Sequence, residues 1–221
     1  MRTKSNIITD STIASQVIGA LREDIVNKRI EAGSHITIKQ VSERYGVSNM
    51  PVREAFRTLE GEGLLIIHPH KGAEVRRIDR DFVRDAYEVN RVLETLMFEN
   101  AMERLDSEAF SELRQINRRI SRLEDNHYDM MHYLELNYQL HEKIFEYNHN
   151  RKAYELFRYQ NSLINSLRSA YVPSYARVQA AYMQHEKILD ALEAKDRIAL
   201  RDAAEEHVVS AMENFLRMYD K

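Results

Sequence analysis

Apolar residues recur every three or four positions along most of this chain, a spacing that predicts amphipathic helices. In the first third, the pattern predicts a helix over 11–29 and a second helix over 38–45 that Gly46 ends. A third helix is expected to begin after Ser48 and to end near Gly61. A tight glycine turn between two short helices is typical of a helix-turn-helix.

Two short aliphatic runs follow, over 64–67 and 73–76, and they flank the polar segment His-Pro-His-Lys-Gly. Such runs around a loop with strong turn formers predict a β-hairpin. Three helices followed by a hairpin wing indicate a winged helix-turn-helix domain.

From residue 79 onward the same spacing continues to the end of the chain, interrupted only by short polar breaks. We expect helices over 80–104, 107–124, 127–149, 151–171, 174–194 and 196–218. All six glycines lie within the first 72 residues, whereas a β-rich domain needs glycine in its turns. The sequence therefore predicts a mainly α protein, with a winged helix-turn-helix domain over 1–78 and an all-α helical bundle over 79–221.

Charge divides at the same boundary. Residues 1–78 hold 12 Lys and Arg against 9 Asp and Glu, whereas residues 79–221 hold 20 against 26. A basic first domain favours contact with a polyanion such as DNA. The chain has no cysteine, which excludes disulfides and thiol chemistry. It shows no long apolar segment and no secretory signal at its start, so we expect no membrane span and a cytoplasmic location.

The third predicted helix carries polar side chains where a DNA-reading helix needs them. Its apolar stripe leaves Asn49, Met50 and Arg53 exposed at the start and Arg57 exposed one turn later. Asparagine and arginine recognise base edges in the major groove, and Ser48 with the first backbone N–H groups can meet a phosphate. A solvated helix that carries two arginines is the simpler alternative on spacing alone.

The segments VSNMPVREAFRTLEGEGLL and HPHKGAEV resemble the DNA-binding domain of the GntR family of bacterial transcription regulators. The resemblance implies DNA contacts from the second helix, the third helix and the wing. These residues are Lys39, Ser48, Asn49, Met50, Pro51, Arg53, His70, Lys71 and Gly72, with Arg57 as a phosphate contact. The family more often carries Arg and Thr at positions 49 and 50. Since Asn prefers an adenine edge and Arg a guanine edge, the operator is expected to differ there.

Three histidines lie on apolar faces of three predicted helices, at His141, His185 and His207. Asn137 precedes His141 by four residues and so lies on the same helical face. Three imidazoles and an oxygen that converge in a bundle core would bind a divalent transition metal. Spacing alone favours the simpler alternative, in which each histidine is hydrogen-bonded separately.

The segments NYQLHEKIFEYNHN, HEKILDALEAKD and AAEEHVVSAMENF resemble the FCD domain of FadR-type GntR regulators. The resemblance implies a metal site for Zn²⁺ or Ni²⁺ beneath an effector pocket. Its ligands would be Asn137, His141, His185 and His207. Asn137 replaces the usual Asp, and a neutral amide binds these cations more weakly than a carboxylate does.

The same resemblance implies that Arg91 holds a carboxylate of the effector, for which a guanidinium is suited by its two parallel donors. The alternative is an ion pair between Arg91 and Glu94 or another acid. From spacing, Asn161, Asn165 and Arg168 share a helical face that could also line the pocket.

These observations predict a ligand-responsive transcription regulator, with repression favoured, that binds a palindromic operator as a homodimer and responds to a small carboxylate. The competing interpretation is a metal-dependent helical-bundle enzyme or carrier with an unrelated basic domain. The chain lacks a phosphate-binding loop, a nucleophile elbow and a zinc-protease motif, so we do not expect an enzyme.

Overall fold

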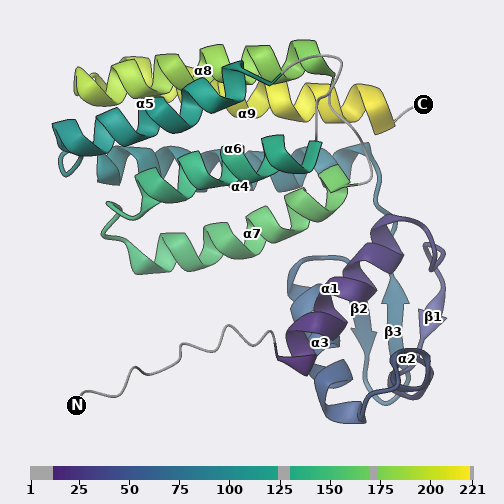
Figure 1. The fold of residues 1–221 in the computed structure, drawn as a ribbon. Coiled ribbons are helices and arrows are strands. Elements are labelled where there is room, and N and C mark those ends of the chain that lie inside the picture. Colours follow the sequence, from purple (N-terminus) through teal and green to yellow (C-terminus); the bar gives the residue numbers. More distant parts are fainter. Residues whose placement is uncertain (1–11, 124–129, 170–173, 220–221) are drawn as a thin grey trace, which may run out of the picture. The chain divides into compact units, whose positions relative to one another are not determined.

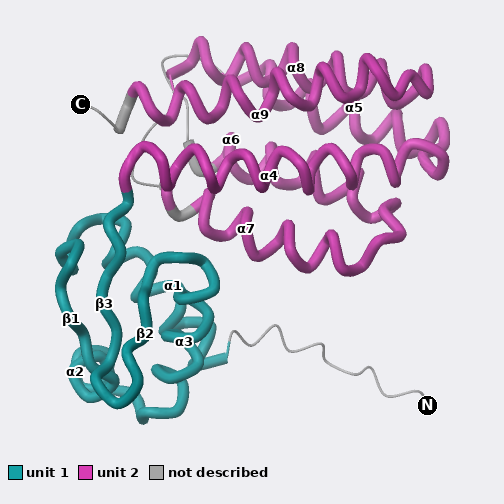
Figure 2. The backbone as a smooth tube through the Cα atoms, turned by 180° about the vertical axis from the view of Figure 1, so that it is seen from behind, with its two compact units in different colours: residues 1–78 teal, residues 79–221 magenta. Residues whose placement is uncertain are grey.

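The computed structural model describes residues 12–123, 130–169 and 174–219 and divides the chain into two compact units. The N-terminal unit comprises residues 1–78, and the C-terminal unit comprises residues 79–221 (Figure 2). The predicted mainly α fold class is confirmed. Among the described residues, no helix has the length and apolar character that a membrane crossing requires.

The N-terminal unit packs three helices against a small antiparallel sheet (Figure 1). Its helices are α1 (Ile13–Val26), α2 (Ile38–Tyr45) and α3 (Asn49–Gly61), and its strands are β1 (His35–Ile36), β2 (Leu65–His68) and β3 (Gly72–Val75). The hairpin of β2 and β3 matches the predicted wing, with Leu65 opposite Val75 and His68 opposite Gly72. The strand β1 was not predicted, because two residues are too few to show an alternating pattern.

The order of the sheet is β1-β3-β2, and Gly72 begins β3 beside Ile36 of β1. Its φ is +113°, and a Cβ atom at this position would lie 2.3 Å from the carbonyl oxygen of Ile36. Only glycine can therefore occupy this position without displacing β1. This steric requirement explains Gly72 independently of any contact with DNA.

Helix α2 begins with a capping box. The Thr37 hydroxyl accepts a hydrogen bond from the Gln40 backbone N–H at 3.2 Å, and the Gln40 side chain accepts one from the Thr37 N–H at 2.8 Å. The backbone N–H groups of Thr37 and Gln40, which have no carbonyl partner within the helix, are thus both hydrogen-bonded. Gly46 ends the helix in the left-handed conformation, with φ at 66°.

Replacing Thr37 by alanine is expected to lower the free energy of unfolding by about 1 kcal/mol, because one helix-terminal N–H loses its partner. Urea unfolding of the full chain measures this loss. Thr37→Ser, which keeps the hydroxyl, is the matched control and should retain most of the stability. Equal loss in both variants would contradict the capping role of the hydroxyl.

The core of the N-terminal unit also contains one ion pair. Arg22 and Glu62 are 8% and 6% exposed, and the Arg22 Nε donates to Glu62 Oε2 at 2.8 Å. A second contact joins Arg22 Nη2 and Glu62 Oε1 at 2.5 Å. This bidentate pair ties α1 to the end of α3, so the orientation of α3 is held from its C-terminal side.

The C-terminal unit consists of helices only. They are α4 (Arg80–Ala101), α5 (Ser107–Ser121), α6 (Met130–Phe145), α7 (Arg151–Ser169), α8 (Tyr175–Glu193) and α9 (Arg197–Tyr219). Helix α4 packs against α6, α7 and α9, and α5 packs against α6 and α8. Each predicted helix is present, but the helices expected to end at 29, 104, 124 and 149 end earlier, at Val26, Ala101, Ser121 and Phe145. The expected helix residues 11, 124, 127–129 and 170–171 lie outside the described residues.

The bundle buries a large apolar core between these helices. Phe98, Leu113, Leu140 and Leu189 are each at most 1% exposed and come from four different helices. Polar residues that enter this core must find partners within the bundle, because water is excluded. The functional candidates of this unit are such residues.

Candidate functional site

Helix α3 presents two opposite faces. Val52, Ala55, Phe56 and Leu59 are buried at 3% exposure or less and pack the helix onto the N-terminal unit. Arg53 and Arg57, with the first residues of the helix, are exposed on the other side. The structure therefore leaves the predicted reading face of α3 open to solvent.

The start of α3 has two further features. Ser48 is the N-cap residue, but its hydroxyl makes no capping hydrogen bond, so it is available to an external acceptor. The Asn49 amide oxygen lies 2.8 Å from the Ser42 hydroxyl, which holds the side chain of Asn49 against α2. Met50, in the first turn of α3, is 75% exposed.

The remaining predicted DNA contacts lie on α2 and on the wing. The Lys39 side chain is 84% exposed, and its ammonium lies 3.9 Å from Glu43. His70 and Lys71 are exposed at the tip of the wing, where His70 has a φ of 62°. Pro51 and Gly72 are half-buried, so they are less accessible to DNA than the exposed residues around them.

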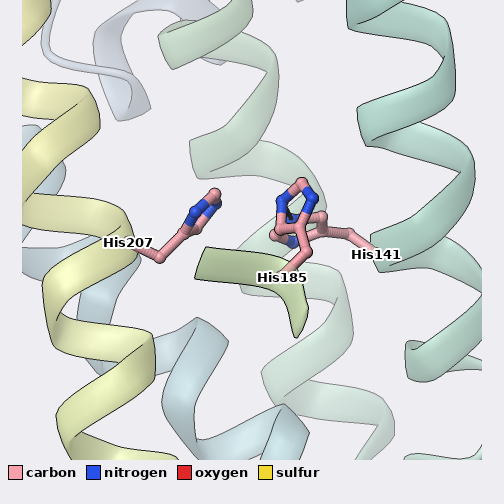
Figure 3. A group of neighbouring side chains, drawn as sticks. All are labelled: His141, His185 and His207. Carbon is pink, nitrogen blue, oxygen red and sulfur yellow. Dashed lines mark hydrogen bonds between the residues drawn. The ribbon is translucent and has the colours of Figure 1, made fainter. Parts of the chain in front are cut away.

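The three predicted histidines meet in the core of the C-terminal unit (Figure 3). His141 comes from α6, His185 from α8 and His207 from α9, and they are 6%, 1% and 5% exposed. One ring nitrogen from each lies within 4.8 Å of the others, and the Nε2 atoms of His141 and His185 are 3.4 Å apart. The structure thus brings together side chains that are 44 and 22 residues apart in sequence.

The hydrogen-bond partners of two rings determine their tautomers. His141 Nδ1 lies 2.5 Å from Glu94 Oε1, and a carboxylate oxygen only accepts, so Nδ1 carries the proton. His185 Nδ1 lies 3.0 Å from Asn117 Oδ1. The Asn117 amide nitrogen donates to Glu186 and to the Tyr182 carbonyl, which fixes its oxygen toward His185.

When both imidazoles are neutral with their protons on Nδ1, the two Nε2 atoms face each other at 3.4 Å with lone pairs. In that form no hydrogen bond joins them, and a cation between them relieves the repulsion of the lone pairs. In a tetrahedral site with bonds of about 2.1 Å, two ligand nitrogens are about 3.4 Å apart. In addition, the buried His207 Nδ1 has no hydrogen-bond partner among the described residues. The donor set fits a transition metal.

Electrostatics favour neutral imidazoles here. Burial lowers the pKa of His185 and the pKa of His207 well below the ordinary value, and the neighbouring histidines and Arg177 lower both further. A neutral imidazole is the form that binds a metal. Burial thus keeps His185 and His207 in the neutral form that a metal ion requires.

Glu94 and Asn117 were not identified from the sequence as members of this site. Each orients one ligand imidazole through its Nδ1, the arrangement common around metal-binding histidines. The sequence does contain a signal for both residues, because each is a polar residue within the apolar face of its helix. Glu94 precedes the buried Met97 on α4, and Asn117 lies between the buried Leu113 and Ile120 on α5. Polar residues on a buried face require a partner, but the sequence does not say which.

A cavity adjoins the histidine cluster and is called the central cavity below. His141 and His207 line it, together with four of the predicted residues: Asn137, Asn161, Asn165 and Arg168. The Arg168 Nε donates to the Tyr87 hydroxyl at 2.9 Å, and no carboxylate lies within 4.0 Å of its guanidinium in the described ranges. One cation, several amides and the carboxylates of Glu94 and Glu142 thus line a polar cavity.

Arg91 does not line the central cavity. Its guanidinium lies 3.5 Å from Glu205, and its side chain is about one-third exposed, at 36%. The expected contact of Arg91 with an effector therefore has no support in this geometry. The alternative, an ion pair with an acid, is what the structure shows, although the partner is on α9 and is not Glu94.

Comparisons with known proteins agree with this architecture. Residues 13–75 match the bacterial regulatory proteins of the gntR family, and residues 85–210 match the FCD domain. The HTH-type transcriptional regulator YdhC of Bacillus subtilis is 26% identical over 195 residues, which cover 88% of this chain and 85% of YdhC. The repressor RspR of Escherichia coli is 24% identical over 214 residues, covering 97% and 93%.

Among solved structures, Escherichia coli McbR/YncC has the same fold, with a TM-score of 0.68 at 20% identity over 93% of this chain and 98% of McbR/YncC. The family and these relatives are transcriptional regulators and not enzymes. Two adjacent family matches, one on each compact unit, cover most of the chain. It is a transcriptional regulator that belongs to the GntR family and carries an FCD domain.

Proposed function

We propose that this regulator binds a palindromic DNA operator as a homodimer, through α3 and the wing of each N-terminal unit. The observation that carries the proposal is the exposed start of α3, where Arg53 and Asn49 face solvent while the opposite stripe is buried. A single unit makes few base contacts, and a twofold pair doubles them. Lys39, Ser48, Arg57, His70 and Lys71 would contact phosphates and the groove edges.

The second part of the proposal concerns the FCD domain. A small carboxylate binds in the central cavity, with Arg168 as its cationic partner, and changes the affinity for DNA. Support comes from the Arg168 guanidinium, which lines the cavity together with Glu94 and Glu142 but forms no ion pair within 4.0 Å with any described residue. A coupling of about 1–3 kcal/mol between effector and operator is expected.

A divalent metal, Zn²⁺ or Ni²⁺, is proposed beside this cavity. His141, His185 and His207 would hold it, and Asn137 would add an amide oxygen. When bound, the metal supplies positive charge that attracts the effector carboxylate. The metal would then link side chains of α6, α8 and α9. Binding of the effector to the metal would therefore act on all three helices at once.

Selection from a random duplex pool tests the DNA-binding part. The purified full chain should enrich one palindromic sequence, and the complex should contain two chains per duplex by sedimentation. Affinity should fall with rising salt, by a slope of about 0.9 in log K per phosphate contact on a log salt axis. Enrichment of no sequence, or one chain per duplex, would overturn the proposed binding mode.

A further inference from the structure

The hydroxyl of Ser42 on α2 contacts the first residue of α3. Ser42 is 9% exposed, and its Oγ atom lies 2.8 Å from the carbonyl oxygen of Ile38 and 2.8 Å from Oδ1 of Asn49. Asn49 is exposed, and its side chain forms no other hydrogen bond with a described residue. Within the part of the chain that the structure describes, Ser42 is therefore the side chain that fixes the orientation of the Asn49 amide.

The two contacts of Ser42 place three oxygen atoms around one proton. A serine hydroxyl carries a single hydrogen, so it donates either to Ile38 or to Asn49, and the other pair of oxygens has no hydrogen between them. A serine within a helix commonly donates to the carbonyl four residues earlier, which here belongs to Ile38. With its proton directed to Ile38, Ser42 Oγ can only accept from Asn49, and an amide oxygen has no hydrogen to donate.

A half-turn of the Asn49 amide gives every group a partner. The turn exchanges Oδ1 and Nδ2, which have nearly the same size, so it requires no change in packing. Nδ2 then donates to Ser42 Oγ, while Oδ1 and the second N–H are free to meet a base. We infer that Ser42 holds Asn49 in this orientation and is thereby a positioning residue for the recognition of DNA bases.

This orientation of Asn49 selects adenine. In the major groove, adenine presents the N6 amino donor beside the N7 acceptor, and an amide that offers both an oxygen and an N–H matches the pair. Guanine presents two acceptors, O6 and N7, so one of them would face the Asn49 oxygen. The opposite orientation would turn Nδ2 outward and would match guanine instead. The inference rests on the proposed binding of DNA by α3 and names the base that Asn49 recognises there.

Operator variants locate the base pair that Asn49 reads. Each base pair in one half-site of the selected operator is replaced in turn, and fluorescence anisotropy compares the affinities of the natural chain and Asn49→Ala. At one position the natural chain should bind adenine about 5–100-fold more tightly than guanine, and Asn49→Ala should lose this preference. A preference of the natural chain for another base at the position that Asn49→Ala affects would overturn the inference.

Replacing Ser42 by alanine tests the positioning role. Without the hydroxyl, the Asn49 amide can present either edge, so the preference for adenine over guanine should fall by about 2–10-fold, mainly through tighter binding of the guanine operator. A variant that only weakened the fold would lose affinity for both operators equally. Ser42→Thr keeps the hydroxyl and should restore the preference. A preference that is unchanged in Ser42→Ala contradicts the role of Ser42.

A modified base tests the same contact without altering the protein, so the test does not depend on the folding of a Ser42 variant. Purine lacks the N6 amino group, and in place of the adenine it should weaken binding of the natural chain about 5-fold or more. The same replacement should not change binding by Asn49→Ala. Equal effects on both proteins would show that Asn49 does not accept a hydrogen bond from N6.

Ser34→Ala is the matched control, because the Ser34 hydroxyl also donates to a backbone carbonyl, that of Glu31 at 2.6 Å, but is not bonded to Asn49. It should keep the preference for adenine. If the natural chain selects an operator and Asn49→Ala shows the same preference at every base pair, only the present inference fails. If no duplex sequence is selected, the proposed binding of DNA fails with it.

Discussion

Replacing Arg53 by alanine is expected to reduce operator affinity by about 30-fold to more than 10,000-fold. A bidentate contact between arginine and a base contributes about 1–3 kcal/mol, and a twofold complex contains the contact twice. Arg53 is exposed on the open face of α3, so its removal disturbs no packing of the core. Fluorescence anisotropy with the selected operator measures the loss, and affinity for unrelated duplexes should change much less.

Two variants separate base reading from general charge. Arg57→Ala, on the same helix, should weaken binding to all duplexes similarly and lower the salt slope by about 1, as expected for a phosphate contact. Arg104→Ala removes one exposed positive charge from the C-terminal unit and should leave operator affinity unchanged. Operator binding by Arg53→Ala at the affinity of the natural chain would show that α3 is not the reading helix.

Zn²⁺ or Ni²⁺ added to metal-free protein is expected to raise the melting temperature by about 5–10 °C. Saturation at 100-fold above the dissociation constant contributes about 2.7 kcal/mol, and a chain of this size gains about 2–4 °C per kcal/mol. His185→Ala should abolish this shift, because it removes an Nε2 atom that faces His141 at 3.4 Å. Differential scanning fluorimetry with and without a chelator measures both effects.

His149→Ala is the matched control for the metal prediction, since His149 is an exposed histidine outside the cluster. It should keep the full metal-dependent shift. Glu94→Gln tests the partner of His141: the side chain keeps its shape but loses its charge, and metal affinity should fall by about 10–100-fold. A shift that persists in His185→Ala would mean that the metal binds elsewhere.

The positions of the helices were predictable because helical periodicity is a local property. Each run of apolar residues at intervals of three and four marks one face, and capping residues such as Thr37 and Gly46 mark the ends. The same reasoning placed Arg53 on the exposed side of α3 and three histidines on buried faces. It left β1 unpredicted, since its two residues gain their conformation only by pairing with β3.

The partners of the buried polar residues were not predictable from spacing. Periodicity marks Glu94, Asn117 and Asn90 as facing inward, but it does not specify which side chain each one meets. The position of Arg91 was not predictable for the same reason. Its place in the helical repeat would allow the side chain to face the cavity, but the packing of α4 against α9 places it beside Glu205. Arg168, from a helix about seventy residues away in sequence, faces the cavity instead.

The sequence by itself determined which segments are helical, which side of α3 is exposed and which residue types are available to a metal and an effector. Only the tertiary structure decided that His141, His185 and His207 share one centre and that Glu94 and Asn117 contact the Nδ1 atoms of His141 and His185. It also decided that Asn90 lines the cavity with an oxygen that has no partner among the described residues. The physical reason is that secondary structure follows from interactions within a few residues. A binding site in a bundle depends instead on how distant helix faces pack, where each buried donor and acceptor must find its partner.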